Sequence, residues 1–219
     1  MHYFIKESRK YLDSFVEQCC INKIPYIKKG VLNIEAFYWW SLVGYFKPDV
    51  ILESGVAYGR STEVLARAQV FFNIPYHYAF DVDPKHYKYV SKKIESYKTV
   101  YQIKSSVEGF NEIKNSNPKA KVVSIIDGPK SGGAFANVLK SLSKFPNLCA
   151  IGCHDCMPTS RIPPVLKSHC KSLFPERHLM FTNKEINRDI QFVNDYICDE
   201  MGEKRDELLD RSNYVGLCI

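Results

Sequence analysis

Two short segments of the sequence place acidic side chains next to basic ones. SIIDGPKSGG contains Asp127 and Lys130, and AIGCHDC contains His154 and Asp155 side by side. Each segment begins with an apolar run of the kind that forms a buried strand. A base held beside carboxylates can take a proton from a substrate; histidine does so without a pKa shift, whereas lysine needs its pKa lowered. We therefore predict that Asp127, Lys130 and His154 are catalytic residues.

A third segment, VILESGVAYGRST, joins an apolar run to a predicted helix through two glycines, Gly55 and Gly59. Glycine lets the backbone approach a ligand closely, and the amides that open a helix near Arg60 would form an anion site. A dinucleotide site requires the spacing G-x-G-x-x-G. Because Ala57 occupies the middle position and Arg60 the last, an NAD-dependent oxidoreductase is the less favoured alternative.

The segment AFDVDP places two acids after another apolar run. In an α/β fold with a parallel sheet, an acid at the end of the second strand can accept hydrogen bonds from both ribose hydroxyls of a bound nucleoside. We assign this role to Asp81. Asp83 is predicted to cap the helix that Pro84 opens.

Helices and strands must bring these residues together. Along most of the chain, apolar runs alternate with amphipathic stretches. Continuous apolar runs between helices are typical of a parallel sheet covered on both faces. The sequence thus predicts a Rossmann-like, doubly wound α/β fold with seven strands, mostly parallel, the last antiparallel. The predicted strands are 49–54, 77–81, 100–104, 122–127, 148–153, about 178–182 and 214–219. The predicted helices are 5–16, one capped by Asn33, 61–72, 84 to about 97, 107–115, 133–145, 165–173 and 186–209.

The pattern E-x-G-x-x-x-G at Glu53–Gly59 resembles motif I of the class I S-adenosylmethionine-dependent methyltransferases, especially the G-V-x-x-G-x-S-T form of small O-methyltransferases. The resemblance implies that Asp81 binds the ribose and that Ser105 and Ser106 lie near the adenine. The cofactor-binding residues it implies are Glu53, Gly55, Val56, Ala57, Gly59, Ser61, Thr62, Asp81, Ser106 and Asp127.

The Asp-x-x-Lys and His-Asp pairs resemble those of the metal-dependent and sugar O-methyltransferases. The resemblance implies a divalent ion such as Mg²⁺, held by Asp127 and Asp155, which would lower the pKa of a substrate hydroxyl. Two departures stand against it: His154 or Cys156 replaces a second acid or amide, and Pro129 occupies a position that is often acidic. We expect Lys130 to be the base with a metal, and His154 to be the base without one.

Composition limits the remaining choices. The chain has 219 residues and a net charge of +6, with its lysines scattered, so a nucleic-acid groove is not expected. Neither a secretory signal nor a 20-residue apolar span is apparent, which indicates a cytoplasmic protein without membrane contact. Eight cysteines are then expected to be reduced thiols. The single C-x-x-C motif is weak evidence for zinc or redox chemistry. The aromatic run from Phe37 to Trp40 is expected in the core rather than in a substrate cleft.

The sequence as a whole predicts one methyltransferase domain over residues 1–219, with a helical cap (1–47) and an α/β core (48–219). The predicted function is O-methylation of a small-molecule hydroxyl, with a sugar or glycan precursor favoured through the resemblance and a phenol next. An RNA or protein methyltransferase and a cofactor-binding protein without turnover remain alternatives. The polar helix 186–209 could mediate a homodimer or cover the edge of the sheet.

Overall fold

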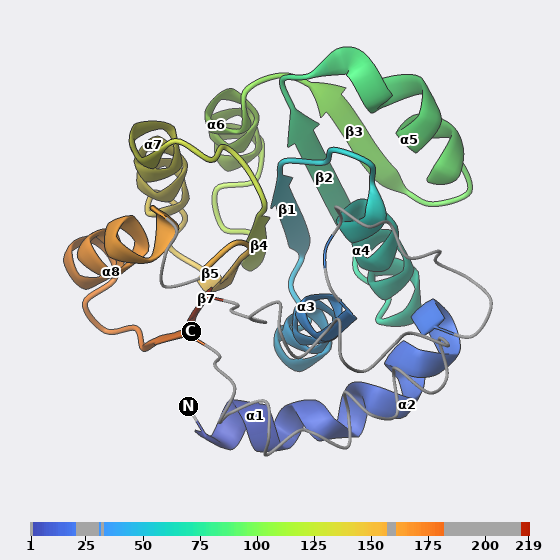
Figure 1. The fold of residues 1–219 in the computed structure, drawn as a ribbon, viewed down its shortest axis with the longest axis horizontal. Helices are drawn as coiled ribbons and strands as arrows, with labels where there is room; N and C mark the ends of the chain where they lie inside the picture. The colour runs from blue at the N-terminus through green and yellow to red at the C-terminus, as the bar shows by residue number, and fades with distance from the viewer. Residues whose placement is uncertain (1, 21–30, 32, 157–160, 182–215) are drawn as a thin grey trace.

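Seven strands form one sheet at the centre of the molecule, in the order β3-β2-β1-β4-β5-β7-β6 (Figure 1). The structure is a computed structural model, and it describes residues 2–20, 31, 33–156, 161–181 and 216–219. All neighbouring strands are parallel except β7, which pairs antiparallel with both β5 and β6. The strands are β1 (Val50–Ser54), β2 (Tyr76–Asp81), β3 (Thr99–Ile103), β4 (Val122–Ile126), β5 (Leu148–Cys153), β6 (Leu179–Phe181) and β7 (Gly216–Cys218).

The two central strands explain why the apolar runs are continuous. Every residue of β1 and of β4 is buried, because helices cover both faces of the sheet. Val50 and Leu52 pack on one face, whereas Ile51 packs on the other. At the edge, β3 leaves Val100 and Ile103 partly exposed. The predicted doubly wound class, with an antiparallel last strand, is confirmed.

Helices lie in two layers. On one face are the N-terminal helices with α4 and α5, and on the other are α6, α7 and α8 (Figure 1). The observed bounds differ from the predicted ones mostly by one to three residues. The elements are α1 (His2–Ser8), η1 (Arg9–Tyr11), α2 (Leu12–Phe15), η2 (Val16–Cys20), α3 (Asn33–Phe46), α4 (Arg60–Phe71), η3 (Pro84–His86), α5 (Tyr87–Lys93), α6 (Ser106–Ser116), α7 (Gly132–Leu142) and α8 (Ile162–Leu173).

The helices α1, α2 and α3 with the turns η1 and η2 form what we call the N-terminal layer, and α3 is its centre. Its side chains from Phe37 to Trp40 are fully buried, so the core interpretation of the aromatic run is confirmed and a substrate-cleft role is excluded for these four residues. The helix has no polar face because α4, β4, β5 and the preceding helices surround it. Trp40 also donates a hydrogen bond through Nε1 to Ser14 Oγ (3.1 Å) on α2.

Some sequence predictions concern other parts of the chain. The predicted helix 186–209, with the homodimer idea built on it, lies outside the described residues. Six cysteines whose side chains the structure describes are free thiols. Within the described ranges, no helix combines the length and the hydropathy that crossing a bilayer requires.

Candidate active site

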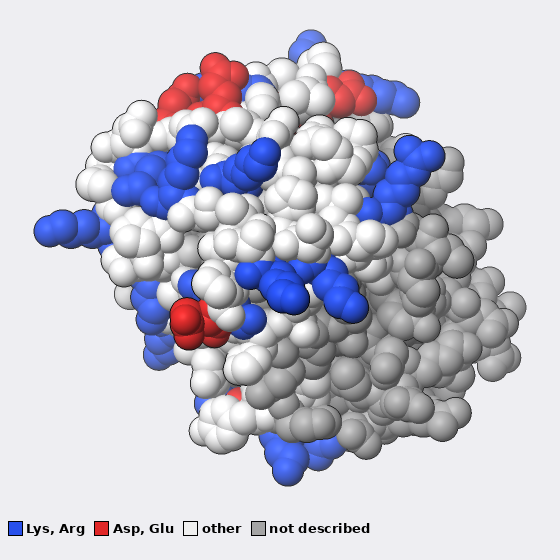
Figure 2. All heavy atoms as spheres, turned by 90° about the vertical axis from the view of Figure 1, so that its left-hand side faces the viewer, with Lys and Arg blue, Asp and Glu red and all other residues white. Residues whose placement is uncertain are grey.

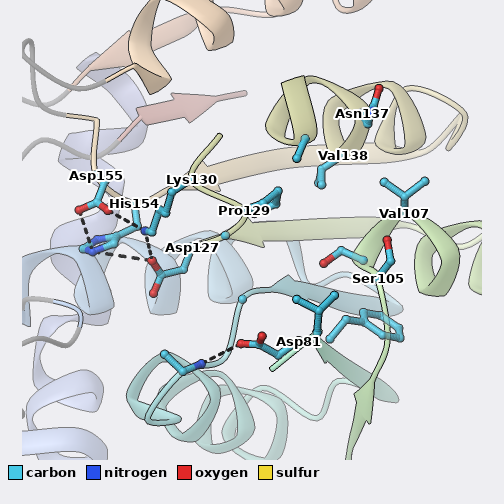
Figure 3. A pocket seen from close by; sticks show the side chains of 17 residues that line it. Asp81, Ser105, Val107, Asp127, Pro129, Lys130, Asn137, Val138, His154 and Asp155 are labelled. Atoms are coloured by element: carbon cyan, nitrogen blue, oxygen red, sulfur yellow. Dashed lines mark hydrogen bonds and ion pairs between the residues drawn. The ribbon is translucent and has the colours of Figure 1, made fainter. Parts of the chain in front are cut away.

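A pocket of about 610 Å³ lies beyond the carboxyl ends of β1, β2, β4 and β5. Strand order reverses between β1 and β4, and this is where open α/β sheets bind ligands. The predicted site residues Gly55, Ala57, Ser106 and those after β4 and β5 line it. One wall is apolar and includes Val107 and Val138 (Figure 3).

The turn after β1 is close to the turn after β4. Gly55 has φ +86°, and a Cβ there would lie 2.6 Å from the backbone nitrogen of Gly128. The amides of Asp127 and Gly128 both donate to the Ser54 carbonyl (2.7 and 3.0 Å). Gly55 is therefore required by the approach of two loops as well as by any ligand, which the sequence pattern alone did not indicate.

Asp81 faces the pocket and also holds the turn after β1 in place (Figure 3). Its Oδ2 accepts hydrogen bonds from the amides of Val56 (2.8 Å) and Ala57 (3.0 Å). Asp83 caps the next helical turn by accepting a bond from the Lys85 amide (2.9 Å), as predicted. The position of Asp81 agrees with the sequence interpretation, while its bonds to the turn were not foreseen.

Several predicted cofactor residues lie beneath the pocket instead of lining it. Glu53 is fully buried; its Oε1 accepts a bond from Thr62 Oγ1 (3.1 Å), and its Oε2 lies 3.3 Å from His77 Nε2. Ser61, Thr62 and Val56 are buried too. The residues on the cofactor list that are not among those lining this pocket are Glu53, Val56, Gly59, Ser61 and Thr62.

The side chain of Arg60 turns away from the pocket. It is buried and donates hydrogen bonds to the Val31 carbonyl and to Asn33 Oδ1. This arginine therefore joins the start of α4 to the start of α3.

Ser106, which lines the pocket, contacts the buried Ser54. Ser54 Oγ lies 2.6 Å from Ser106 Oγ, across 52 positions of sequence. Ser105 precedes α6 with extended backbone and lines the pocket as well. Both predicted serines are thus at the site, and Ser54 is a contact that the sequence analysis missed.

Four charged groups after β4 and β5 form one cluster, as predicted (Figure 3). Lys130 Nζ lies 2.7 Å from Asp127 Oδ1 and 2.6 Å from Asp155 Oδ2. His154 Nε2 lies 3.1 Å from Asp155 Oδ1 and 3.7 Å from Asp127 Oδ1. Asp155 has φ +55°, a left-handed conformation that Asp tolerates better than most residues.

A fifth charged residue, Glu35, comes from the N-terminal helix α3. Its Oε1 lies 2.8 Å from His154 Nδ1, and only 2% of Glu35 is exposed. The sequence signal was an acid inside an apolar helix, NIEAFYWW, whose apolar residues alone supported the helix prediction. A buried carboxylate needs a partner, but the sequence does not say which one.

The cluster holds protons firmly on its two basic groups. Burial alone would lower the pKa of His154, but Glu35, Asp127 and Asp155 raise this pKa to about 9. Burial likewise opposes the charge on Lys130, yet Asp127 and Asp155 raise its pKa above the usual value. Burial raises the pKa of Asp127 even though His154 and Lys130 oppose this. In the ion-free arrangement His154 therefore holds its proton at neutral pH, and its role as a base without a metal stays a prediction.

Comparison with solved structures finds methyltransferases. An SAH-bound methyltransferase from Podospora anserina superimposes with a TM-score of 0.55 and 12% identity, over 98% of this chain and 86% of that one. An O-methyltransferase from Bacillus cereus, in complex with SAH, gives a TM-score of 0.55 and 14% identity, over 99% of this chain and 90% of that one. The chain has a class I methyltransferase fold. No family model and no curated protein sequence matches the chain.

Within this methyltransferase fold, the charged cluster has donors that suit a divalent cation. Asp127, His154 and Asp155 each offer one ligand atom, and these atoms lie within 4.8 Å of one another. By contrast, Cys153 and Cys156 are buried free thiols beside the cluster, and the described residues place no second cysteine pair with them in a group that could hold a metal.

Proposed function

We propose that the protein is an S-adenosylmethionine-dependent O-methyltransferase that acts on a hydroxyl group of a small molecule. The observation that carries this proposal is the placement of a nucleoside-sized pocket and a charged cluster at the same end of a methyltransferase fold. The pocket's volume, about 610 Å³, lies within the usual range for small-molecule sites. The methyltransferases from Podospora anserina and Bacillus cereus, which share the fold, were solved with SAH.

In this proposal, one part of the pocket binds the nucleoside of the cofactor and another part lies beside its amino-acid end. Asp81 receives the ribose hydroxyls, and Ser105 and Ser106 lie near the base. Gly55 and Ala57 form the wall beside the amino-acid end of the cofactor. The cofactor supplies a methyl group already activated on sulfonium, so the protein has to align the acceptor and remove its proton.

The charged cluster is assigned to proton removal. Lys130 and His154 both keep their protons at neutral pH when only carboxylates surround them. We infer that Asp127 and Asp155 would hold a divalent cation, which would supply Lewis-acid polarisation of an acceptor hydroxyl and would compete with Lys130 for both carboxylates. Lys130, less tightly paired with the two carboxylates, would be the group that takes the acceptor proton.

The charge on one face of the molecule supports the assignment of a small-molecule acceptor. On the face that Figure 2 shows, Lys and Arg side chains form separate groups divided by uncharged side chains. Such a distribution does not favour a nucleic-acid strand, which is bound through continuous phosphate contacts. A sugar or glycan precursor is the first acceptor class to test and a phenol the second, on the sequence resemblance stated above.

The test combines binding and turnover. The protein should bind SAH in calorimetry and transfer a labelled methyl group to at least one member of a panel of sugars, nucleotide sugars and catechols. Gly55→Ala should lower SAH affinity by more than tenfold, since its Cβ would meet Gly128 and the residue has a positive φ. Gly133→Ala is the control, because a Cβ there meets no atom within 4 Å.

Three outcomes would count against the proposal. Binding of NADH in place of SAH would make the protein an oxidoreductase. If protein that a chelator has stripped of metal still transfers methyl groups at the full rate, the reaction needs no cation. If Gly55→Ala and wild type bind SAH with equal affinity, the turn after β1 is not part of the cofactor site.

A further inference from the structure

Glu35 is a buried carboxylate inside an aromatic helix. Next to it in the chain, Ile34, Ala36 and Phe37 are buried in the core. Burial of a charge is costly unless the charge is paired. Its Oε1 lies 2.8 Å from Nδ1 of His154, so the contact joins helix α3 to the charged cluster across 119 positions of sequence.

This contact decides which nitrogen of His154 faces the two aspartates. The backbone amide of His154 donates to the Ile126 carbonyl (2.9 Å), which fixes the start of the loop after β5. With Nδ1 held by Glu35, Nε2 is directed toward Asp155 and Asp127 (Figure 3). A carboxylate that accepts the Nδ1 hydrogen leaves the lone pair of a neutral imidazole on Nε2, as in the carboxylate–histidine–metal arrangement.

The donor set is therefore one imidazole nitrogen and two carboxylate oxygens. The three atoms lie within 4.8 Å of one another, close enough to bind one ion. Sites made only of carboxylates, carbonyls and water suit Mg²⁺, Ca²⁺ or Mn²⁺, whereas an imidazole nitrogen suits ions such as Fe²⁺, Ni²⁺ or Zn²⁺. The chemistry of the ligands thus points to a particular class of cation.

We propose that Glu35 is a positioning residue that holds Nε2 of His154 as the third ligand of a cation site with Asp127 and Asp155, and that this site prefers a transition-metal ion to Mg²⁺. The inference rests on the cation in the proposed function and goes beyond it, because that function requires only the two carboxylates. It makes the N-terminal layer a part of the active centre.

The first experiment asks whether a histidine nitrogen binds the ion. Wild-type protein loaded with Mn²⁺ should give a nitrogen coupling in pulsed electron paramagnetic resonance, and this coupling should change when the histidines carry ¹⁵N. In His154→Asn the coupling should disappear. Bound Mn²⁺ without nitrogen coupling, or no binding of Mn²⁺ at all, would overturn the inference.

The second experiment asks whether Glu35 orients that nitrogen. Loss of such a supporting carboxylate typically costs about 10–100-fold in metal affinity, so Glu35→Gln should weaken Mn²⁺ binding by that amount. Glu63→Gln is the matched control: Glu63 is also buried, and it is paired with Arg67 and Lys93 away from the cluster. The preference for Zn²⁺ over Mg²⁺ should narrow in His154→Asn, because the imidazole is the ligand that favours the zinc ion. Unchanged Mn²⁺ affinity in Glu35→Gln would refute the role of Glu35.

Calorimetry with SAH separates this inference from the proposed function. If SAH binds but no nitrogen coupling is seen, the inference fails and the methyltransferase assignment stands. If SAH does not bind, the methyltransferase assignment fails whatever the metal does. Should Glu35→Gln not fold, ¹⁵N spectra of Zn²⁺-loaded wild type decide the matter: a proton on Nδ1 of His154 supports the inference, and one on Nε2 overturns it.

Discussion

Three carboxylates surround the imidazole of His154, and each of them favours its charged form. Glu35 faces Nδ1, while Asp127 and Asp155 face Nε2. These contacts outweigh burial, which taken alone would favour the neutral ring. The ring is thus a proton-holding group when no cation is bound.

This arrangement predicts how stability depends on pH in the metal-free protein. The pKa of His154 is raised from 6.5 to about 9 by folding. Its stabilising contribution is therefore fully present below pH 6.5 and is lost as the pH rises through 9. We expect wild type to exceed His154→Gln in unfolding free energy by up to about 3 kcal/mol at pH 6, with the difference shrinking by pH 9.5.

The measurement is urea unfolding of wild type and His154→Gln between about pH 6 and pH 9.5, in the presence of a chelator. Titrating groups outside the cluster affect both proteins alike, so the difference reports the imidazole together with the carboxylates coupled to it. A gap that stays constant, or grows, as the pH rises would contradict the predicted contribution of His154.

The four residues after β4 and β5 could be predicted from sequence because parallel strands end at one edge of the sheet. Asp127 and Lys130 follow one apolar run, His154 and Asp155 the next, and topology brings them together. Glu35 could not be assigned in this way. Its pairing depends on how α3 packs under β5, and no local pattern specifies that contact.

At the scale of elements, Glu53 joins β1, β2 and α4 beneath the pocket. It accepts a bond from Thr62 on α4 and lies against His77 on β2. His77 continues the chain of contacts to Thr99 on β3, with Nδ1 3.0 Å from Oγ1. The sequence motif placed Glu53 next to the cofactor, whereas these contacts indicate a structural role.

The two interpretations of Glu53 predict different results for Glu53→Ala. Removing Glu53 takes away the buried acceptor of Thr62 Oγ1 and the carboxylate beside His77. Leaving a buried polar group unpaired typically costs about 1–3 kcal/mol, and we expect a loss of this order in urea unfolding. If Glu53 instead contacts the cofactor, SAH affinity would fall while stability stayed unchanged. The exposed Glu108 supplies the control, since Glu108→Ala should alter stability by less than about 0.5 kcal/mol.

Most element types could be predicted because apolar runs, glycines and prolines mark them locally. Strand β5 occupies residues 148–153, which is the range predicted for it. Asp83 caps the start of η3, also as expected. The functions of the motif residues were less predictable. Alternation along β1 directs Glu53 and Ile51 to the face covered by α4, and the motif pattern alone does not reveal which strand face borders the pocket.

At the scale of the whole molecule, two arginines of α4 hold the N-terminal layer against the α/β core. Arg60 binds the Val31 carbonyl and the Asn33 side chain at the start of α3. Arg67 donates to the Gln18 carbonyl (2.8 Å) in η2. Because α3 also carries Glu35, the attachment of this layer and the geometry of the charged cluster are physically connected.

Arg60→Lys tests this connection. The planar guanidinium reaches two acceptors at once, which a single ammonium group cannot do with the same geometry. We expect a loss of about 1–3 kcal/mol in unfolding free energy, the usual cost of leaving a buried polar group unpaired. Hydrogen exchange in α3 should become faster, and Mn²⁺ affinity should fall because Glu35 is held less firmly. Arg161→Lys, at an exposed position, should change none of these quantities. If α3 exchanges as slowly in Arg60→Lys as in wild type, the guanidinium is not what fixes this layer, and the packing of the α3 aromatic residues alone must hold Glu35 against His154.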